Sequence, residues 1–446
     1  MKLRCFGLLL PAAGLCAAGT LQLNSAAFDT SQFRVTEFRT EVPNPVGMTI
    51  LPDGSFGVGA YYPGIIRYTD WNHDGFADGP GERMNLSGGP KTGLLAAGGY
   101  YIEGNSGDYY NNGKPEISIL KPGSDVTAMD NMAIAGKLQF DYPDGWYHNQ
   151  VGIATRPRAG QPGSYDLVFN VGSQWDHEAS TQPVQLSGLI SGTLDGDSLY
   201  AVTLNLSGGQ PSASNLRKIA SGIRNVIGMG FQPGTGDFYF ADNAINGTGP
   251  DADEPPQAEE LNRILAADFD SGAVPNFGYP NCYIGYRTGL AIDTGGTGCV
   301  QPFYALQPIA NGTVLGSESE GAAQISFAPA NFPAAFSNGI FIGFSGKGTT
   351  GADNEENAVG FYDFNTSTYL HFVENSQDGV AMPIGLLATN DSLFIADYGT
   401  GTIYQVTAAA PEPGTWAAGL AGLLGVVWTG RRQRHPAHTR REKRHY

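Results

Sequence analysis

The chain has 446 residues and a formal net charge of −17, with only 15% charged residues but 63 glycines. This acidic balance excludes recruitment of a nucleic acid by charge, because the protein would repel the phosphate backbone. The length exceeds that of one ordinary β-sandwich. Short apolar runs alternate with Gly, Pro, Asn and Asp, and no long amphipathic helical period is present, so the sequence indicates an all-β fold with tight turns.

The N-terminus has the pattern of a secretory signal peptide. Lys2 and Arg4 precede an apolar stretch over residues 5–18. Cleavage after Ala18 and cleavage after Ala27 both fit the small residues nearby, and we take residues 1–27 as the signal segment. The sequence therefore predicts an exported protein. Both chain ends are basic, so the exported part is more acidic than the whole chain, which suits calcium binding.

An acidic segment over residues 70–78 has the spacing of a calcium loop. Asp70, Asn72, Asp74 and Asp78 place oxygen ligands at positions 1, 3, 5 and 9, and a glycine at position 6 permits a sharp turn. No glutamate stands at position 12. We expect a surface calcium site, and the alternative is a plain Asp/Asn turn.

A strand–turn–strand unit recurs along the chain. Each copy joins an apolar strand to a second one through Pro, Asp or Gly, and the copies cover residues 44–60, 148–173, 224–243, 321–345 and 382–397, with a weaker one near residue 92. Six such units predict a single six-bladed β-propeller over residues 33–407. The first strand of each blade lines the central channel of that fold, so residues at strand starts are candidates for function.

His148 is the best candidate for a general base. The segment between the two predicted terminal signals contains four histidines, and His148 alone opens a strand that we expect to face the channel. Imidazole titrates near neutrality and can take a proton from a hydroxyl group. The alternative is a structural histidine that hydrogen-bonds a neighbouring blade.

Two cysteines remain once the signal segment is removed. Cys282 and Cys299 lie 17 positions apart in an exported protein, which favours one disulfide that closes a loop. A metal-binding pair and two free thiols are the alternatives.

The C-terminus combines three elements in a fixed order. The tripeptide Pro411, Glu412, Pro413 is followed by an apolar run over residues 416–428 and a basic tail over residues 431–444. This order resembles the PEP-CTERM sorting signal of Gram-negative bacteria. The resemblance implies, for residues 408–446, transient inner-membrane contact through a short transmembrane helix. It also implies cleavage by an exosortase and release to the cell envelope or the exterior. The alternative is a single-span anchor with a positive cytoplasmic flank.

Three motifs resemble the glucose/sorbosone dehydrogenase family. They are Gly-Ile-Arg-Asn-Val-Ile-Gly-Met-Gly-Phe at residues 222–231, Glu-Glu-Leu-Asn-Arg-Ile at 259–264 and Asn-Phe-Gly-Tyr-Pro-Asn-Cys-Tyr at 276–283. The resemblance implies a soluble quinoprotein propeller that oxidises a sugar hydroxyl or an aldose by hydride transfer to pyrroloquinoline quinone. A histidine then acts as the base, and calcium polarises the quinone.

The resemblance also assigns roles to particular residues. Arg224 and Asn225 match the pair that contacts the cofactor, because a guanidinium can bind quinone carboxylates. Lys347 offers a further positive charge, while Glu259 and Glu260 match the calcium loop of the family. The alternatives are an arginine that ties two blades together, a solvated lysine and a solvated acidic loop.

The sequence departs from the family pattern at three places. Ser345 and Lys347 flank a glycine where the family has a histidine motif, Met382 replaces an arginine, and Tyr147 stands where an acidic residue precedes the base. Two other functions therefore stay open. One is a non-catalytic propeller of the envelope or matrix that binds glycan or protein, and the other is a calcium-dependent lactone hydrolase.

Overall fold

The computed structural model describes residues 21–51, 53–60, 64–70, 72–83, 91–107, 114–122, 132–247, 255–295, 298–309, 321–345, 358–374 and 381–409. Most of the predicted signal segment, Lys347 and the motif Pro411, Glu412, Pro413 lie outside the described residues. Within the described part, no helix has the length and apolar character needed to cross a membrane.

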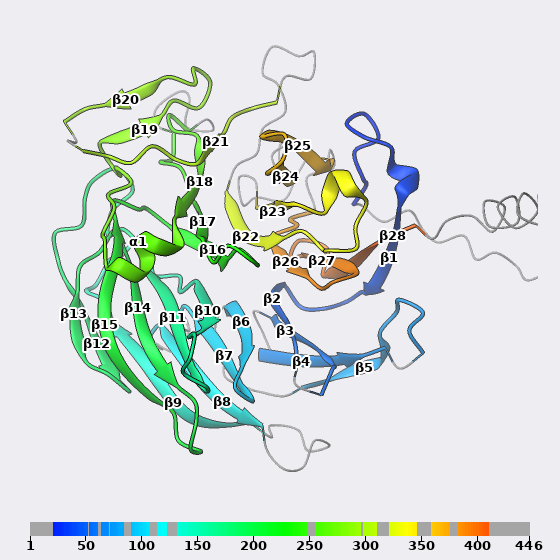
Figure 1. Ribbon diagram of the computed structural model, residues 1–446, viewed down its shortest axis with the longest axis horizontal. Coiled ribbons are helices and arrows are strands. Elements are labelled where there is room, and N and C mark those ends of the chain that lie inside the picture. The colour runs from blue at the N-terminus through cyan, green and yellow to red at the C-terminus, as the bar shows by residue number, and fades with distance from the viewer. Residues whose placement is uncertain are drawn as a thin grey trace, which may run out of the picture.

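The described strands form a six-bladed β-propeller, as the repeats predicted (Figure 1). Blade 1 contains β2 (Pro45–Ile50), β3 (Phe56–Ala60), β4 (Gly64–Thr69) and β5 (Asp78–Arg83). Blade 2 contains β6 (Lys91–Ala97), β7 (Tyr100–Asn105), β8 (Glu116–Pro122) and β9 (Met132–Asp141). Blade 3 contains β10 (Ile153–Pro157), β11 (Ser164–Val171), β14 (Ser198–Asn205) and β15 (Ser212–Ser221).

The second half of the chain supplies the other three blades. Blade 4 contains β16 (Val226–Phe231), β17 (Phe238–Asp242), β18 (Glu259–Ile264) and β21 (Tyr304–Leu306). Blade 5 contains β22 (Ala322–Phe327), β23 (Gly339–Phe344), β24 (Val359–Asp363) and β25 (Thr368–Val373). Blade 6 contains β26 (Gly385–Ala388), β27 (Ser392–Asp397), β28 (Thr402–Ala408) and, from the N-terminus, β1 (Phe33–Arg39).

The first strands of the six blades contact one another in a closed circle, in the order β2, β6, β10, β16, β22, β26 and back to β2. The circle closes because β1 pairs antiparallel with β28, with Phe33 opposite Ala408. The glycine of the recurrent strand start permits this close packing. A Cβ atom at Gly228 in β16 would lie 2.0 Å from the carbonyl oxygen of Ala323 in the next blade.

Large apolar side chains fill the spaces between neighbouring blades. Phe140 and Phe169 pack edge to face between blades 2 and 3, and Phe341 and Phe372 belong to the cluster between blades 5 and 6. Strand residues alternate between the two faces of each blade, so every blade contributes to two such clusters. Burial on both faces explains why the strand sequences are almost continuously apolar.

Two insertions leave the regular blade pattern. Between β11 and β14 the chain forms the hairpin β12 (Val184–Gly188) and β13 (Gly192–Leu194), which extends the sheet of blade 2 beyond β9. Between β18 and β21 it forms α1 (Ala266–Ser271) and the hairpin β19 (Cys282–Ile284) and β20 (Ala291–Asp293). Short 3₁₀ helices occur at η1 (Thr30–Gln32) and η3 (Ala334–Phe336).

Residues just before β1 belong to the folded body. Leu21 is buried, Leu23 forms an isolated bridge with Val373 in blade 5, and Phe28 stacks on Phe372. Cleavage after Ala27 would remove the bridge and the buried leucine.

Candidate functional site

The residues expected around the base come together at one end of the propeller. His148 lies between β9 and β10, Ser173 follows β11, and Arg224 and Asn225 precede β16. The backbone N–H of His148 donates to the carbonyl of Ser173 (3.1 Å), and that of Ser173 donates to the carbonyl of Arg224 (2.8 Å). We call His148, Ser173, Asp176, Arg224 and Asn225 the histidine cluster.

A glycine permits this convergence. A Cβ atom at Gly172 would lie 2.8 Å from the Cβ of His148 and 3.2 Å from the carbonyl oxygen of Arg224. Both distances are shorter than ordinary van der Waals contact. A larger residue at position 172 would therefore separate the segments that carry His148 and Arg224.

The hydrogen bonds of Ser173 fix the tautomer of His148. Nδ1 of His148 lies 2.7 Å from Oγ of Ser173, and that hydroxyl donates to the carbonyl of Trp175 (2.6 Å). Because the hydroxyl hydrogen is used by Trp175, Oγ accepts the hydrogen from Nδ1. Nε2 then carries the lone pair, and no described residue forms a hydrogen bond with it. This nitrogen is available to accept a proton or a hydroxyl hydrogen from a ligand.

His148 is neutral at ordinary pH. Its side chain is buried, and burial together with the charge of Arg224 lowers the pKa of His148 to about 3, while Asp176 acts in the opposite direction. The imidazole is therefore unprotonated near neutral pH. It can accept a hydrogen bond there, although a pKa this low makes it a weak base.

Arg224 forms an ion pair with Asp176. Nε of Arg224 donates to Oδ1 of Asp176 (3.0 Å), and Nη2 contacts the same oxygen. The arginine side chain is almost fully buried, and the aspartate belongs to the insertion that follows β11. Burial opposes ionisation, but Arg224 holds the pKa of Asp176 below its usual range. The ion pair thus joins blade 4 to blade 3. This is the contact expected of an arginine that ties two blades together, which was the alternative role for Arg224.

The backbone of Arg224 and Asn225 is held by Asp242 at the end of β17. The Asp242 carboxylate accepts the N–H of Arg224 (2.9 Å) and the N–H of Asn225 (2.7 Å). Nδ2 of Asn225 donates to Oδ1 of Asn243 (2.8 Å), while Oδ1 of Asn225 is buried without a hydrogen-bond partner among the described residues. Burial raises the pKa of Asp242 to about 7.

Glu259 and Glu260 lie side by side at the start of β18 but face opposite sides of the blade. Glu259 accepts the N–H of Gly321 (2.9 Å) in the segment before blade 5. Glu260 accepts from the side chains of Gln257 and Asn262 (both 3.2 Å). Burial and, after it, the charge of Asp242 raise the pKa of Glu260 to about 8. The two glutamates therefore do not form a common ligand group in this structure.

The acidic loop expected over residues 70–78 joins β4 to β5, and Asn72, Asp74 and Asp78 are exposed. Oδ2 of Asp70 accepts the N–H of Gly75 (3.2 Å), and Oδ1 of Asp74 accepts the N–H of Phe76 (2.9 Å). Nδ2 of Asn72 donates to Asp74 (2.9 Å), and Asp78 begins β5. The expected ligands thus close a turn by their own hydrogen bonds. No three carboxylates of this loop are grouped as tightly as metal ligands in the described part of the chain.

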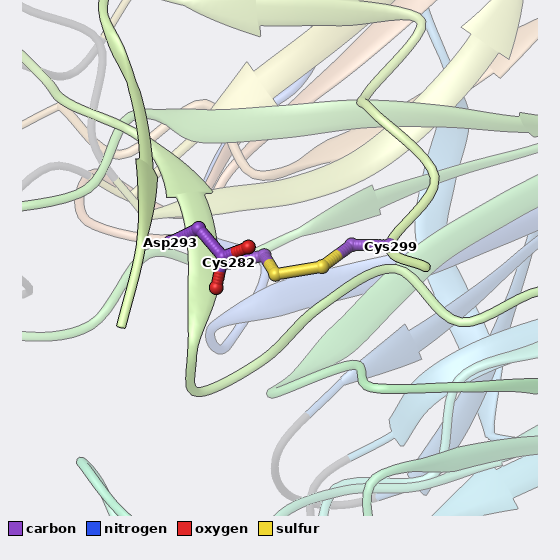
Figure 2. Close-up of side chains that lie close together, drawn as sticks. All are labelled: Cys282, Asp293 and Cys299. Carbon is purple, nitrogen blue, oxygen red and sulfur yellow. A yellow bond between two sulfur atoms is a disulfide. The ribbon is translucent and has the colours of Figure 1, made fainter. Parts of the chain in front are cut away.

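The predicted disulfide is present between Cys282 and Cys299, whose Cα atoms are 6.5 Å apart (Figure 2). Asp293 lies opposite Cys282 in the β19–β20 hairpin, and it completes the tightest group of possible metal ligands in the described residues. Both sulfur atoms are bonded to each other, so they offer no thiolate to a metal. The disulfide confirms the first of the three alternatives for these cysteines.

Two exposed aromatic side chains flank the histidine cluster. Tyr147 is 53% exposed and meets His148 edge to face, with ring centroids 4.5 Å apart. Trp175 is 43% exposed, and its carbonyl accepts from Ser173 and from the hydroxyl of Tyr279 (2.8 Å). The N–H of Tyr147 donates to the carbonyl of Gln174, which aligns the two segments.

Four residues of this site were missed by the sequence reasoning, namely Ser173, Trp175, Asp176 and Asp242. The run Gly-Ser-Gln-Trp-Asp-His directly after a buried strand contains three of them. Polar and aromatic residues concentrated at a strand end were the available signal. The Asp at the end of β17 was visible in the repeat, but its role as acceptor for two backbone N–H groups depends on the fold.

Comparison with known proteins finds similarity only in structure. No protein-family model matches the chain, and no curated protein does. A carbohydrate-active enzyme of family AA12 from Trichoderma reesei aligns in its iodide structure with a TM-score of 0.61 and 15% identity, over 87% of this chain and 98% of that chain. Its calcium structure gives a TM-score of 0.60 and 14% identity, over 87% and 97%.

A second solved structure is the holo form of the PQQ domain of pyranose dehydrogenase from Coprinopsis cinerea. It aligns with a TM-score of 0.57 and 14% identity, over 87% of this chain and 97% of that chain. These alignments show that the chain shares the whole propeller fold with these proteins. At such low identity they establish the fold and leave the activity to be argued from the site.

Proposed function

We propose that this protein is an exported sugar oxidoreductase of the quinoprotein type, in which His148 takes the proton of a sugar hydroxyl. The observation that carries the proposal is the imidazole itself. Its Nδ1 is fixed by Ser173, its Nε2 forms no hydrogen bond with the described residues, and Arg224 is close enough to lower the pKa of the ring. The shared fold with the PQQ domain of a pyranose dehydrogenase supports the same reading.

The chain positions the base and limits its protonation. A sugar hydroxyl that donates to Nε2 of His148 transfers its proton there as the carbon–hydrogen bond is broken. The hydrogen bond from Nδ1 to Ser173 keeps the ring in the required tautomer and orientation. The imidazolium formed is opposed by Arg224 and favoured by Asp176, so this ion pair adjusts how easily the proton is taken.

The donor set fits a cofactor of the implied kind. Oδ1 of Asn225 is buried and unpartnered within the described chain, and Nη1 of Arg224 forms no hydrogen bond there. An anionic group on Arg224 and a cation or N–H donor on Asn225 would satisfy both, as pyrroloquinoline quinone with calcium can. Held by Arg224 and Asn225, such a quinone would supply the hydride acceptor, and calcium would polarise it.

The surroundings of Nε2 suit an uncharged sugar. Tyr147 presents an exposed ring beside the buried imidazole, and Nδ2 of Asn246 lies 3.3 Å from its hydroxyl. The exposed Trp175 lies two residues from Ser173, and Tyr279 donates to its backbone carbonyl. Rigid aromatic faces with a few polar groups between them are typical of small-ligand sites. We therefore assign an aldose or a terminal sugar of a glycan as the substrate class.

The test is aldose-dependent dye reduction by the purified exported protein, with pyrroloquinoline quinone and calcium added together and singly. The proposal predicts reduction that needs the quinone and a sugar. Absence of turnover with a panel of aldoses, in protein shown to be folded and to bind the quinone, would exclude the oxidoreductase.

A second candidate function is a sugar-binding propeller without catalysis. The observation that favours it is the partner of His148, which is a serine hydroxyl and no carboxylate, together with the pKa of about 3 for His148. Such an imidazole accepts hydrogen bonds well but takes protons poorly. Calorimetric sugar binding that persists without the quinone, in protein that shows no turnover with it, would identify this function.

Export and sorting form the last part of the proposal, and they rest on the sequence alone. We expect exosortase to cleave near Pro411, Glu412, Pro413, which leaves the propeller in the envelope or outside the cell. C-terminal mass analysis of the protein from its native host tests this. A mature chain that still carries the basic tail over residues 431–444 would show a simple anchor.

A further inference from the structure

Asp176 occupies the guanidinium that an anionic ligand would need. Its Oδ1 accepts from Nε of Arg224 (3.0 Å) and contacts Nη2, and its backbone carbonyl lies 3.4 Å from the same Nε. One edge of the guanidinium is thus already used. Bidentate binding along this edge is the usual way in which arginine holds a carboxylate.

The aspartate is held in place by more than the arginine. Its Oδ2 lies 3.0 Å from Nε2 of His177, and the backbone N–H of Asn246 is a further hydrogen-bond partner. Asp176 comes from the insertion after β11, whereas Asn246 comes from the segment after β17. Because three separate groups hold the carboxylate, it remains at Arg224 without a ligand.

This pairing changes the charge that a ligand meets. Arg224 is the positive group of the histidine cluster, and its ion pair with Asp176 makes the net charge of the two side chains zero. The Arg224 side chain is 4% exposed and that of Asp176 is 21% exposed, so solvent screens their contact weakly. A ligand carboxylate must therefore compete with an ion that is already desolvated and bonded.

We propose that Asp176 is a built-in counter-anion of Arg224, which cancels the positive charge that an anionic ligand would meet and therefore weakens binding of carboxylate-bearing ligands relative to uncharged ones. The role is one of specificity, because Asp176 itself need not touch the reacting atoms. The proposal rests on the proposed function for its choice of ligand, pyrroloquinoline quinone. It concerns binding of that ligand and does not require turnover.

The experiment is a titration of the purified exported protein with pyrroloquinoline quinone in calcium-containing buffer, followed by tryptophan fluorescence, in which Trp175 is a neighbouring reporter. Asp176→Asn keeps the side-chain shape and one acceptor oxygen but removes the charge. We expect it to bind the quinone about tenfold more tightly than the wild type. Asp141→Asn is the matched control, because Asp141 at the end of β9 also forms an ion pair, with Lys114, and both of those side chains are exposed.

Two further variants make the result specific. The gain should disappear in the double variant Asp176→Asn with Arg224→Gln, since it depends on the freed guanidinium. If thermal denaturation shows that Asp176→Asn is not folded, Asp176→Ser tests the same removal of charge with a smaller side chain. A folded Asp176 variant that binds the quinone no better than the wild type overturns the proposal, as does an equal gain in Asp141→Asn.

Failure of this inference can be told apart from failure of the proposed function. A protein that gains quinone affinity on loss of the Asp176 charge but never reduces dye supports the counter-anion and removes the oxidoreductase. Turnover by the wild type, without any gain of quinone affinity in the Asp176 variants, supports the oxidoreductase and overturns the counter-anion role of Asp176.

Discussion

Blades 4 and 6 both end their second strand with an aspartate, but the two aspartates accept the backbone N–H groups of different residues. Asp242 closes β17 and accepts the backbone N–H groups of Arg224 and Asn225. Asp397 closes β27 and accepts the backbone N–H of Met382 (2.8 Å). Both carboxylates are buried, and burial raises the pKa of each. The aspartate is therefore a structural feature of the blade, and the chemistry depends on which residues it holds.

The two blades also differ in what braces them. The fourth strand of blade 6 is β1, which comes from the N-terminus, whereas blade 4 reaches its fourth strand through the insertion between β18 and β21, which carries α1, the β19–β20 hairpin and the disulfide. This insertion returns to the histidine cluster, because the N–H of Tyr279 donates to the carbonyl of Gly222 (2.9 Å) and its hydroxyl reaches Trp175. Extra bracing is found where the polar residues are, which is the expected support for a preorganised site.

Removal of the disulfide should have the largest effect on stability. Replacement of Cys282 and Cys299 by alanine frees a loop of 17 residues in sequence separation, which costs about 3 kcal/mol of unfolding free energy in the chain-entropy account. Denaturant unfolding of the double variant measures this. An unchanged midpoint and slope would show that the insertion does not need its cross-link to brace blade 4.

The two aspartates should separate stability from function. Asp242→Ala and Asp397→Ala each leave buried N–H groups without an acceptor, and we expect each to lose about 1–3 kcal/mol of unfolding free energy. Only Asp242→Ala should also lower sugar affinity or turnover, because it alone releases Arg224 and Asn225. Equal losses of function in the two folded variants would contradict the comparison.

Blade 4 should also make stability depend on pH. The pKa of Asp242 is raised to about 7 and that of Glu260 to about 8, chiefly by burial. Carboxyls with a raised folded pKa contribute stability at low pH that is lost as the pH rises through those values. We expect the unfolding free energy to fall by at least about 1 kcal/mol from pH 5.5 to pH 8.5.

Glu260→Gln is the matched variant for this effect, since it keeps the hydrogen-bonding shape and cannot ionise. It should flatten the pH dependence. If the unfolding free energy of the wild type is constant from pH 5.5 to pH 8.5, ionisation of the buried carboxyls does not destabilise the fold.

The fold could be predicted from the sequence because it depends on repetition. The recurrent strand start with its glycine appears in four copies with little change, at Gly47, Gly152, Gly228 and Gly385, and each copy becomes the first strand of a blade. The pairing of Cys282 with Cys299 was equally accessible, because the chain offers one pair outside the signal segment.

The site could be predicted only in part, since it depends on contacts between distant segments. His148 and Arg224 were found because they open repeat units. The contact of Arg224 with Asp176 joins residues 48 positions apart, and the one between Tyr279 and Trp175 joins residues 104 positions apart. Neither pair carries a local pattern. The opposite orientation of Glu259 and Glu260 follows from strand alternation, but only once their strand is known.

His148 as the base is tested by the rate of aldose-dependent dye reduction by His148→Ala, measured with the quinone and calcium. His371→Ala is the matched control, because His371 is also buried but lies on the outer strand β25 of blade 5. We expect His148→Ala to lower turnover by about 100-fold or more with the fold intact, and His371→Ala to keep the turnover of the wild type. Wild-type turnover in the folded His148→Ala protein would contradict the assignment of the base.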